Sequence, residues 1–157
     1  AGLLEAQDGD LLWEKKKYTP DDLRPLVHWI GPDTPLKPQL TVMENMKFWA
    51  AAQNAPQDGT SILNALDKLG LAPLAETKVR YLSAGQLRRA GLCRLFLSER
   101  PLWLLDEPAT GLDQDSAKKL VELVKNHTKN KGIAIIATHR PDFWKATQEL
   151  HLDGSDS

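Results

Sequence analysis

The sequence is poor in the features that mark several large classes of protein. It has a single cysteine, Cys93, so it can form no internal disulfide, and a small buried packing residue is the favoured interpretation. Its 20 basic and 21 acidic residues leave a net charge of -1, which gives no electrostatic reason to expect nucleic acid as a partner. No apolar run approaches the roughly 20 residues that span a bilayer, and the first residues lack the basic start and apolar core of a signal peptide.

The second half of the chain alternates apolar strands with amphipathic helices. Strands are predicted at 102–105 and 133–137, and helices at 83–99 and 115–130. Short, continuously apolar strands separated by helices indicate an α/β fold with a mainly parallel sheet covered on both faces. Ligands of such sheets bind outside the carboxyl ends of the strands.

The first half has shorter elements. We expect a turn at 8–10 followed by a short strand, a solvated basic loop at 15–17, and a buried strand within 25–30. The stretch 31–39 contains three prolines, which excludes both a helix and a central strand.

Two further helices are predicted from their start signals. Thr41 can cap the first, with Glu44 three residues later in capping-box spacing. Thr60 or Ser61 can cap the second, which has an apolar side and a stop signal at Gly70.

Two acidic residues, Asp106 and Glu107, directly follow the predicted strand at 102–105. One carboxylate can hold a magnesium ion through water, and the other can orient or deprotonate an attacking water. The alternative is an acidic turn after a strand.

A second candidate site is the run Leu82–Gln86, where Ser83 and Gly85 precede a helix. Free backbone N–H groups and the helix dipole make such an N-terminus suitable for an anion. Taken alone, an ordinary serine N-cap is the commoner explanation.

The order of the motifs favours the functional interpretation over an acidic turn and an ordinary N-cap, because together the motifs resemble the ABC ATPase family. Leu82–Gln86 resembles the family's signature motif, Leu102–Glu107 its Walker B segment and Ala109–Asp113 its D-loop. His139, at the end of the next strand, resembles its switch histidine.

The resemblance assigns roles to residues in the chain's own site. It implies ATP as the nucleotide, with Asp106 supporting Mg2+ and Glu107 as the catalytic carboxylate. It also implies that His139 contacts the terminal phosphate and helps to position the water.

The remaining residues are implied to act across a head-to-tail dimer of ATPase domains. Ser83, Gly85 and Gln86 would bind the terminal phosphate of an ATP held by the opposing domain. Asp113 would communicate between the two domains.

The sequence departs from the family in two places. It contains no Gly-x-x-x-x-Gly-Lys-Ser/Thr, the Walker A loop that cradles phosphates. Because residues 1–13 resemble the segment that follows this loop, we expect a partial P-loop NTPase domain whose first strands and Walker A precede Ala1. Pro32 stands where the family has the glutamine of its glutamine loop.

One subfamily is more similar than the others, the ATP-binding subunit of the haem exporter used in cytochrome c maturation. The similar stretches are 30–31 and 36–41 with Glu44 and Asn45, 83–86 followed by two arginines, and 101–103. That subfamily often has histidine at the position of Pro32.

We therefore expect one partial ABC ATPase domain over 1–157, with 1–31 and 100–157 in the sheet core and 32–99 as a helical subdomain. The resemblance implies a transmembrane permease as partner and a peripheral location on the cytoplasmic face of the inner membrane. One alternative is a non-catalytic subunit that offers its signature motif in trans to a partner with Walker A. A soluble ABC ATPase of translation or chromosome maintenance is disfavoured, because the sequence has no heptads and no basic arm.

Overall fold

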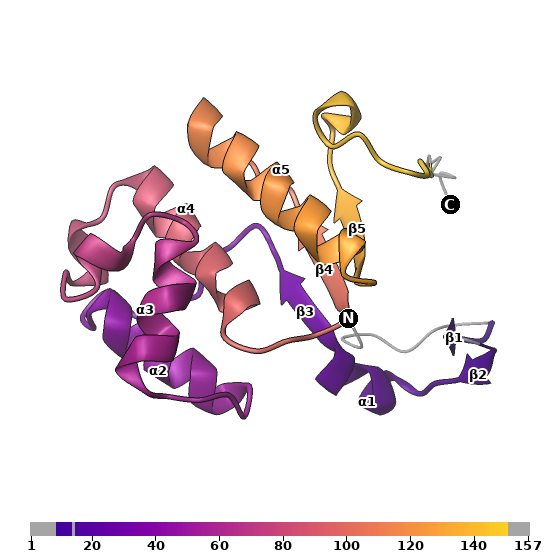
Figure 1. Ribbon diagram of the computed structural model, residues 1–157, viewed down its shortest axis with the longest axis horizontal. Helices are drawn as coiled ribbons and strands as arrows, with labels where there is room; N and C mark the ends of the chain where they lie inside the picture. The colour runs from indigo at the N-terminus through magenta and orange to yellow at the C-terminus, as the bar shows by residue number, and fades with distance from the viewer. Residues whose placement is uncertain (1–8, 14, 151–157) are drawn as a thin grey trace, which may run out of the picture.

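The fold is described from a computed structural model, which describes residues 9–13 and 15–150 (Figure 1). The strands are β1 (Leu12–Trp13), β2 (Lys16–Lys17), β3 (Val27–Ile30), β4 (Leu102–Asp106) and β5 (Ile133–Ala137). The α-helices are α1 (Pro20–Leu23), α2 (Val42–Ala52), α3 (Gly59–Asp67), α4 (Ala84–Leu92) and α5 (Gln114–Lys129). Short 3-10 helices are η1 (Arg24–Leu26), η2 (Ala72–Leu74), η3 (Val79–Tyr81), η4 (Cys93–Phe96) and η5 (Pro141–Phe143).

The centre of the structure is a parallel sheet in the order β3-β4-β5. Leu105 is opposite Ile30 on one side and Ile136 on the other, so the three strands end at the same level. This confirms the predicted α/β class and brings the residues after each strand to one edge.

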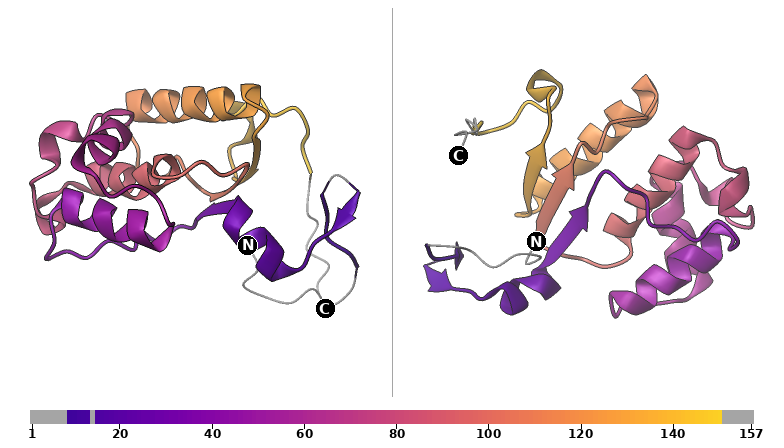
Figure 2. Two further views of the ribbon diagram at one scale, coloured as in Figure 1. Left: turned by 60° about the horizontal axis from the view of Figure 1, so that its bottom comes forward. Right: turned by 180° about the vertical axis from the view of Figure 1, so that it is seen from behind.

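The two faces of the sheet differ. Trp103 and Leu105 of β4 are buried in one core with Leu120 of α5, which lies across this face (Figure 2). On the other face Trp29 is 47% exposed and Ile135 is 58% exposed. The expectation that both faces are covered is therefore wrong for the described residues, because α5 shields only one set of the alternating side chains.

The helices α2, α3 and α4 form a group beyond the β3 edge of the sheet (Figures 1 and 2). Its core is fully buried and includes Met46 of α2, Ile62 and Leu66 of α3, and Leu92 of α4. None of the described helices has both the length and the apolar character needed to cross a bilayer.

The predicted capping box of α2 is present. The Thr41 hydroxyl accepts from the Glu44 N–H at 3.0 Å, and the Glu44 carboxylate accepts from the Thr41 N–H at 2.7 Å. For α3 the predicted cap is wrong, because Asp58 is the N-cap and accepts from the Ser61 N–H at 2.9 Å. Its aspartate satisfies the first turn even though the helix then begins at a glycine.

Two other predicted elements differ in extent. The helix expected at 83–99 ends at Leu92 and continues as η4. Beyond that point the carbonyl groups of Arg94 and Ser98 accept hydrogen bonds from the side chains of Gln53 and His28, at 3.3 and 2.9 Å, and Arg94 also accepts from the Leu97 N–H in a 3-10 turn. The loop expected at 15–17 instead contains β2, which is exposed and pairs with β1; Asp8 of the expected turn lies outside the described residues.

Candidate active site at the ends of β4 and β5

Glu107 is the first residue after β4, and its backbone is fixed on both sides. Its N–H donates to the carbonyl oxygen of Ala137 in β5 at 2.9 Å. Its φ angle is +43°, in the left-handed region that non-glycine residues seldom occupy. The end of the sheet thus holds this residue in an unusual conformation, which is frequent at functional sites.

The carboxylate of Glu107 is surrounded by donors from two loops. Its Oε1 accepts from the backbone N–H of His139 at 2.8 Å and lies 2.7 Å from the Nδ1 atom of that histidine. Its Oε2 accepts from the hydroxyl groups of Thr110 at 3.3 Å and Thr138 at 3.4 Å. The two catalytic residues predicted from the sequence, Glu107 and His139, are therefore in direct contact.

These contacts decide the charge of Glu107. Partial burial raises its pKa, but the hydrogen bonds from the side chain and backbone of His139 outweigh this and lower the pKa overall. The side chain of His139 is 73% exposed and that of Glu107 29% exposed. An ionised carboxylate is thus held beside a histidine whose side chain is largely exposed.

Sequence reasoning missed Thr110 and Thr138. Thr110 is three residues after Glu107, and Thr138 immediately precedes His139. Hydroxyl groups so close in sequence to two predicted catalytic residues are a usable signal, because the strand ends bring both loops together.

Asp106 is the last residue of β4 and is opposite Ala137 in the register. Among the described residues, no three His, Cys, Asp or Glu side chains gather as metal ligands. Magnesium needs only one or two carboxylates when water and phosphate oxygens complete its shell. A single carboxylate such as Asp106 is compatible with Mg2+ on this ground, and its role as the metal contact stays a prediction.

The predicted signature residues are at the N-terminus of α4. The Ser83 hydroxyl accepts from the Gln86 N–H at 3.3 Å, and the Gln86 side chain accepts from the Ser83 N–H at 2.9 Å. The ordinary capping function of Ser83 is therefore present. It does not exclude a phosphate, because the N-terminal turn still carries the positive end of the helix dipole.

The signature turn lies against the D-loop of the same chain. A Cβ atom at Gly85 would be 3.4 Å from the carbonyl oxygen of Gly111, which has a φ angle of +79°. Asp113 caps α5 by accepting from the Ser116 N–H at 2.8 Å, and the hydrogen bonds from Ser116 lower the pKa of Asp113. In the described part of the chain, no hydrogen bond joins these side chains to Glu107 or His139, so the candidate residues form two groups.

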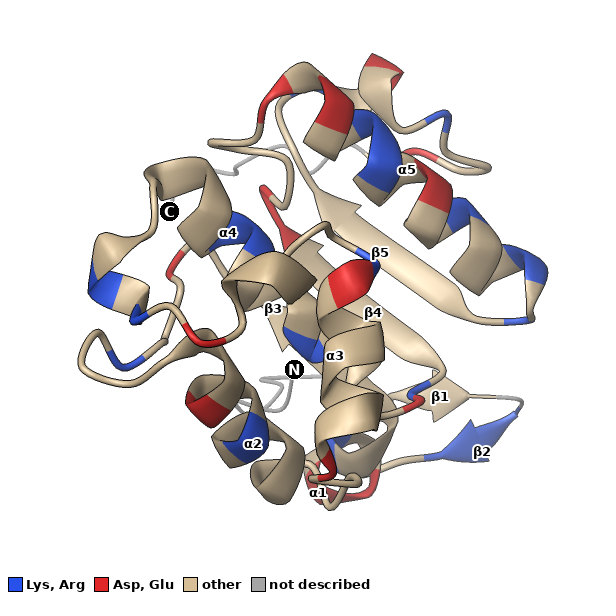
Figure 3. Cartoon of the chain, turned by 60° about the vertical axis from the view of Figure 1, so that its left-hand side comes forward, with Lys and Arg blue, Asp and Glu red and all other residues tan. Residues whose placement is uncertain are grey.

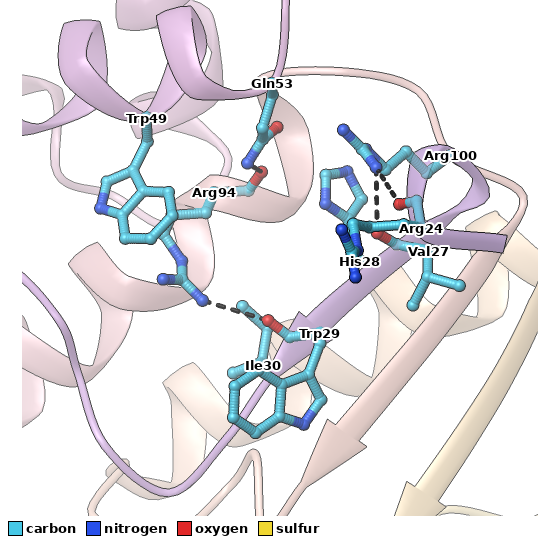
Figure 4. Close-up of a pocket in the computed structure, with 9 residues that line it drawn as sticks. All are labelled: Arg24, Val27, His28, Trp29, Ile30, Trp49, Gln53, Arg94 and Arg100. Carbon is cyan, nitrogen blue, oxygen red and sulfur yellow. Dashed lines mark hydrogen bonds between the residues drawn. The ribbon is translucent and has the colours of Figure 1, made fainter. Parts of the chain in front are cut away.

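A cavity of about 200 Å3 lies elsewhere, beside β3 and the helical group (Figure 4). Arg94 lines it, with its guanidinium 4.2 Å from the Trp49 ring centre and donating to the Trp29 carbonyl at 3.1 Å. Burial lowers the pKa of Arg94 to about 10. These contacts anchor β3 to the helices, and the cavity belongs to neither candidate group.

Comparison with known proteins agrees with this geometry. Residues 1–110 match the family described as ABC transporter. The fold is similar to an ABC transporter ATP-binding protein from Pyrococcus furiosus, with a TM-score of 0.75 and 22% identity over 87% of this chain and 66% of that one. It is also similar to a bacterial ABC transporter cassette solved as a dimer, with a TM-score of 0.78 and 21% identity over 92% of this chain and 68% of that one.

The chain belongs to the ABC transporter family, in its class of ATP-hydrolysing subunits. It is 40% identical to the cytochrome c biogenesis ATP-binding export protein CcmA of Vibrio cholerae, over 91% of this chain and 70% of that protein. It is also 40% identical to the CcmA protein of Paramagnetospirillum magneticum, over 98% of this chain and 72% of that protein.

Proposed function

We propose that this chain functions in an ATP-binding and ATP-hydrolysing subunit of an exporter for cytochrome c biogenesis, with haem as the exported molecule. The 40% identity to two CcmA proteins supports the subfamily. The contact between Glu107 and His139 carries the catalytic part of the proposal, because it joins the two predicted catalytic residues across adjacent strand ends.

The proposed reaction is hydrolysis of the terminal phosphate of ATP. The oxygen of a water forms a bond to the terminal phosphorus, and the bond to the bridging oxygen breaks, which leaves ADP and inorganic phosphate. Glu107 accepts a hydrogen bond from that water and takes up the proton that the water loses, since its lowered pKa favours the ionised form. When His139 turns toward the phosphate, Glu107 loses a donor and becomes a stronger base. Magnesium bound at Asp106 would supply charge neutralisation on the phosphates.

The second group acts in trans in this proposal. The N-terminus of α4, with Ser83, Gly85 and Gln86, binds the terminal phosphate of an ATP on the opposing ATPase domain. Asp113 lies in the loop beside Gly85 and links the two sites. The two domains form a head-to-tail dimer.

The membrane partner of the proposed subunit is a transmembrane permease. It docks on the helical region 32–99 and on the loop at 32–39, while β3 from the segment 1–31 and β4 and β5 from the segment 100–157 supply the sheet core. The subunit is peripheral, on the cytoplasmic face of the inner membrane. This division is supported by the position of α2, α3 and α4 beyond the β3 edge of the sheet (Figure 1).

The test uses the natural gene product that carries this sequence, purified with its membrane partner. Replacing Glu107 by glutamine removes the anionic acceptor and should lower ATP hydrolysis by at least about a hundredfold. The control is Glu122→Gln on the exposed side of α5, which should leave the rate unchanged. Wild-type hydrolysis in the Glu107→Gln variant would contradict the proposal.

A second candidate function uses only the signature turn at the N-terminus of α4. The chain could serve as a non-catalytic subunit that offers its signature turn to a partner with an intact phosphate loop. Mixing the purified chain with such a partner should then increase hydrolysis, and Ser83→Arg should abolish the increase. If no complex forms, this candidate is excluded.

A further inference from the structure

Arg88, on α4, makes contacts that the proposed roles do not include. Its side chain is buried, and its Nη1 atom donates to the carbonyl oxygens of Gly31 and Pro32, both at 3.0 Å. Its Nη2 atom donates to the carbonyl oxygens of Asp106 and Glu107, at 3.3 and 2.9 Å. One guanidinium thus joins the helix of the signature motif to the ends of β3 and β4. Figure 3 shows α4 next to β3.

The chemistry of this contact requires arginine. Burial lowers the pKa of Arg88, and the negative charge of Asp106 opposes that effect. The Nε atom has no hydrogen-bond partner among the described residues, so the burial of this cation is not fully compensated. A planar fork of donors reaches two pairs of carbonyl groups at once, which the single ammonium of lysine cannot do.

We propose that Arg88 is a positioning residue that couples the signature helix to the catalytic carboxylate of the same chain. This inference rests on the proposed function. Ser83 and Arg88 belong to one rigid helix, so a displacement of its N-terminus on phosphate binding moves the guanidinium. The guanidinium holds the carbonyl of Glu107, whose N–H is already fixed by Ala137. The Glu107 carbonyl also accepts from the Thr110 N–H at 3.1 Å, so a displacement of Arg88 acts on a backbone segment that is otherwise held in place around the catalytic carboxylate.

The position of Pro32 strengthens this inference. The family resemblance places a glutamine there, and Pro32 has no side-chain amide with which to sense the site. Arg88 instead holds the main-chain carbonyl of Pro32 and that of Glu107 within one hydrogen-bonded group. The loop that follows β3 is thus connected to the catalytic residue by the backbone, independently of the side chain at position 32.

Arg100 provides a matched control at the opposite end of the same two strands. Its Nη1 atom donates to the carbonyl oxygens of Arg24 at 2.7 Å and Val27 at 3.2 Å (Figure 4). Like Arg88, it ties chain segments together through main-chain carbonyls. Unlike Arg88, it makes these contacts before β3 and β4 rather than after them.

The experiment compares Arg88→Met, Arg88→Lys and Arg100→Met in the natural gene product with its membrane partner. For Arg88→Met we expect a kcat about 10- to 100-fold below wild type, because a small displacement of a catalytic group has this effect, with KM for ATP within about twofold. Arg88→Lys should retain the fold without restoring kcat. Arg100→Met should lower the melting temperature yet keep kcat within about twofold of wild type, since it lies away from the reacting groups.

The outcomes separate the two proposals. A wild-type kcat in Arg88→Lys, or equal losses of kcat in Arg88→Met and Arg100→Met, would overturn the coupling by Arg88. Glu107→Gln in the same preparation reports on the proposed function. If the wild type hydrolyses ATP no faster than Glu107→Gln, the proposed function fails. If the wild type is active and the Arg88 variants have the same kcat as the wild type, only the coupling fails.

Discussion

Replacing Asn45 by alanine tests how the loop at 31–39 is held against the helical group. Asn45 lies in α2 and is 1% exposed. Its side-chain oxygen accepts from the Lys37 N–H at 2.7 Å, and its amide donates to the carbonyl oxygens of Lys37 at 3.1 Å and Thr41 at 2.9 Å. One side chain thus fastens the middle of a loop that otherwise has little regular structure.

The magnitude follows from what the neighbours lose. The Thr41 carbonyl also accepts from the Asn45 N–H, and the Lys37 carbonyl also accepts from the Leu40 N–H, so both keep a partner. The Lys37 N–H loses its acceptor, which costs about 1–3 kcal/mol, and two further hydrogen bonds cost about 1 kcal/mol each. The better helix propensity of alanine returns about 0.6 kcal/mol. We expect a net loss of about 2.4–4.4 kcal/mol, or about 5–18 °C in Tm for a domain of this size.

Thermal unfolding of the natural gene product, followed by circular dichroism, measures this change. The control is Asn64→Ala on the exposed side of α3, which gains the same helix propensity and should stay within about 0.5 kcal/mol of wild type. Stimulation of hydrolysis by the membrane partner should fall more in Asn45→Ala than the basal rate does. Equal Tm values for the two variants would refute the reasoning about the loop.

Two further predictions concern Gly91 and His139. A Cβ atom at Gly91 would lie 2.8 Å from the Thr34 methyl group, so Gly91→Ala should destabilise the fold by about 1–2 kcal/mol even after its gain in helix propensity. A Cβ atom at Gly59 would have no atom within 4 Å, so Gly59→Ala should be neutral or stabilising in the same unfolding assay. His139→Ala should lower Tm near neutral pH, because it removes a hydrogen bond to ionised Glu107. This hydrogen bond lowers the pKa of Glu107, so its stabilisation is present above the usual glutamate pKa of 4.5 and is lost as the pH falls through the pKa of Glu107 in the folded protein. The Tm values of wild type and His139→Ala should therefore converge at low pH. A difference in Tm that stays constant down to the lowest pH would contradict this.

Much of the sheet could be predicted because its strands are marked by local patterns in the sequence. The apolar runs at 102–105 and 133–137 allow few structures other than strands, and the acids after the first run mark its end. Burial of the second run could not be predicted in this way, since Ile133 and Ile135 are exposed. The parallel direction of the two strands then follows from the helix between them, because parallel neighbours are joined by a crossover connection of this kind. The contact between Glu107 and His139 is a consequence of that register.

Features that depend on distant partners could not be predicted in this way. The change from α4 to η4 after Leu92 is accompanied by hydrogen bonds from Gln53 and His28 to carbonyl groups that follow the helix. Both residues are distant from the helix in the sequence, so its local pattern cannot show them. The cap of α3 was misplaced because Thr60 and Ser61 are good capping residues, and only the backbone shows that Asp58 performs this function. In both cases local propensity allowed more than one boundary and tertiary contacts selected one.

Arg88 shows the same limit at the functional site. In the sequence it is one of two adjacent arginines after the signature motif, and nothing distinguishes it from its neighbour. In the structure Arg89 donates to the Leu69 carbonyl within the helical group, whereas Arg88 points to the strand ends. Consecutive helix positions are about 100° apart, so adjacent identical residues meet different surroundings. The coupling proposed for Arg88 therefore depends on the face of α4 that packs toward β3 and β4, and that packing is a property of the whole fold.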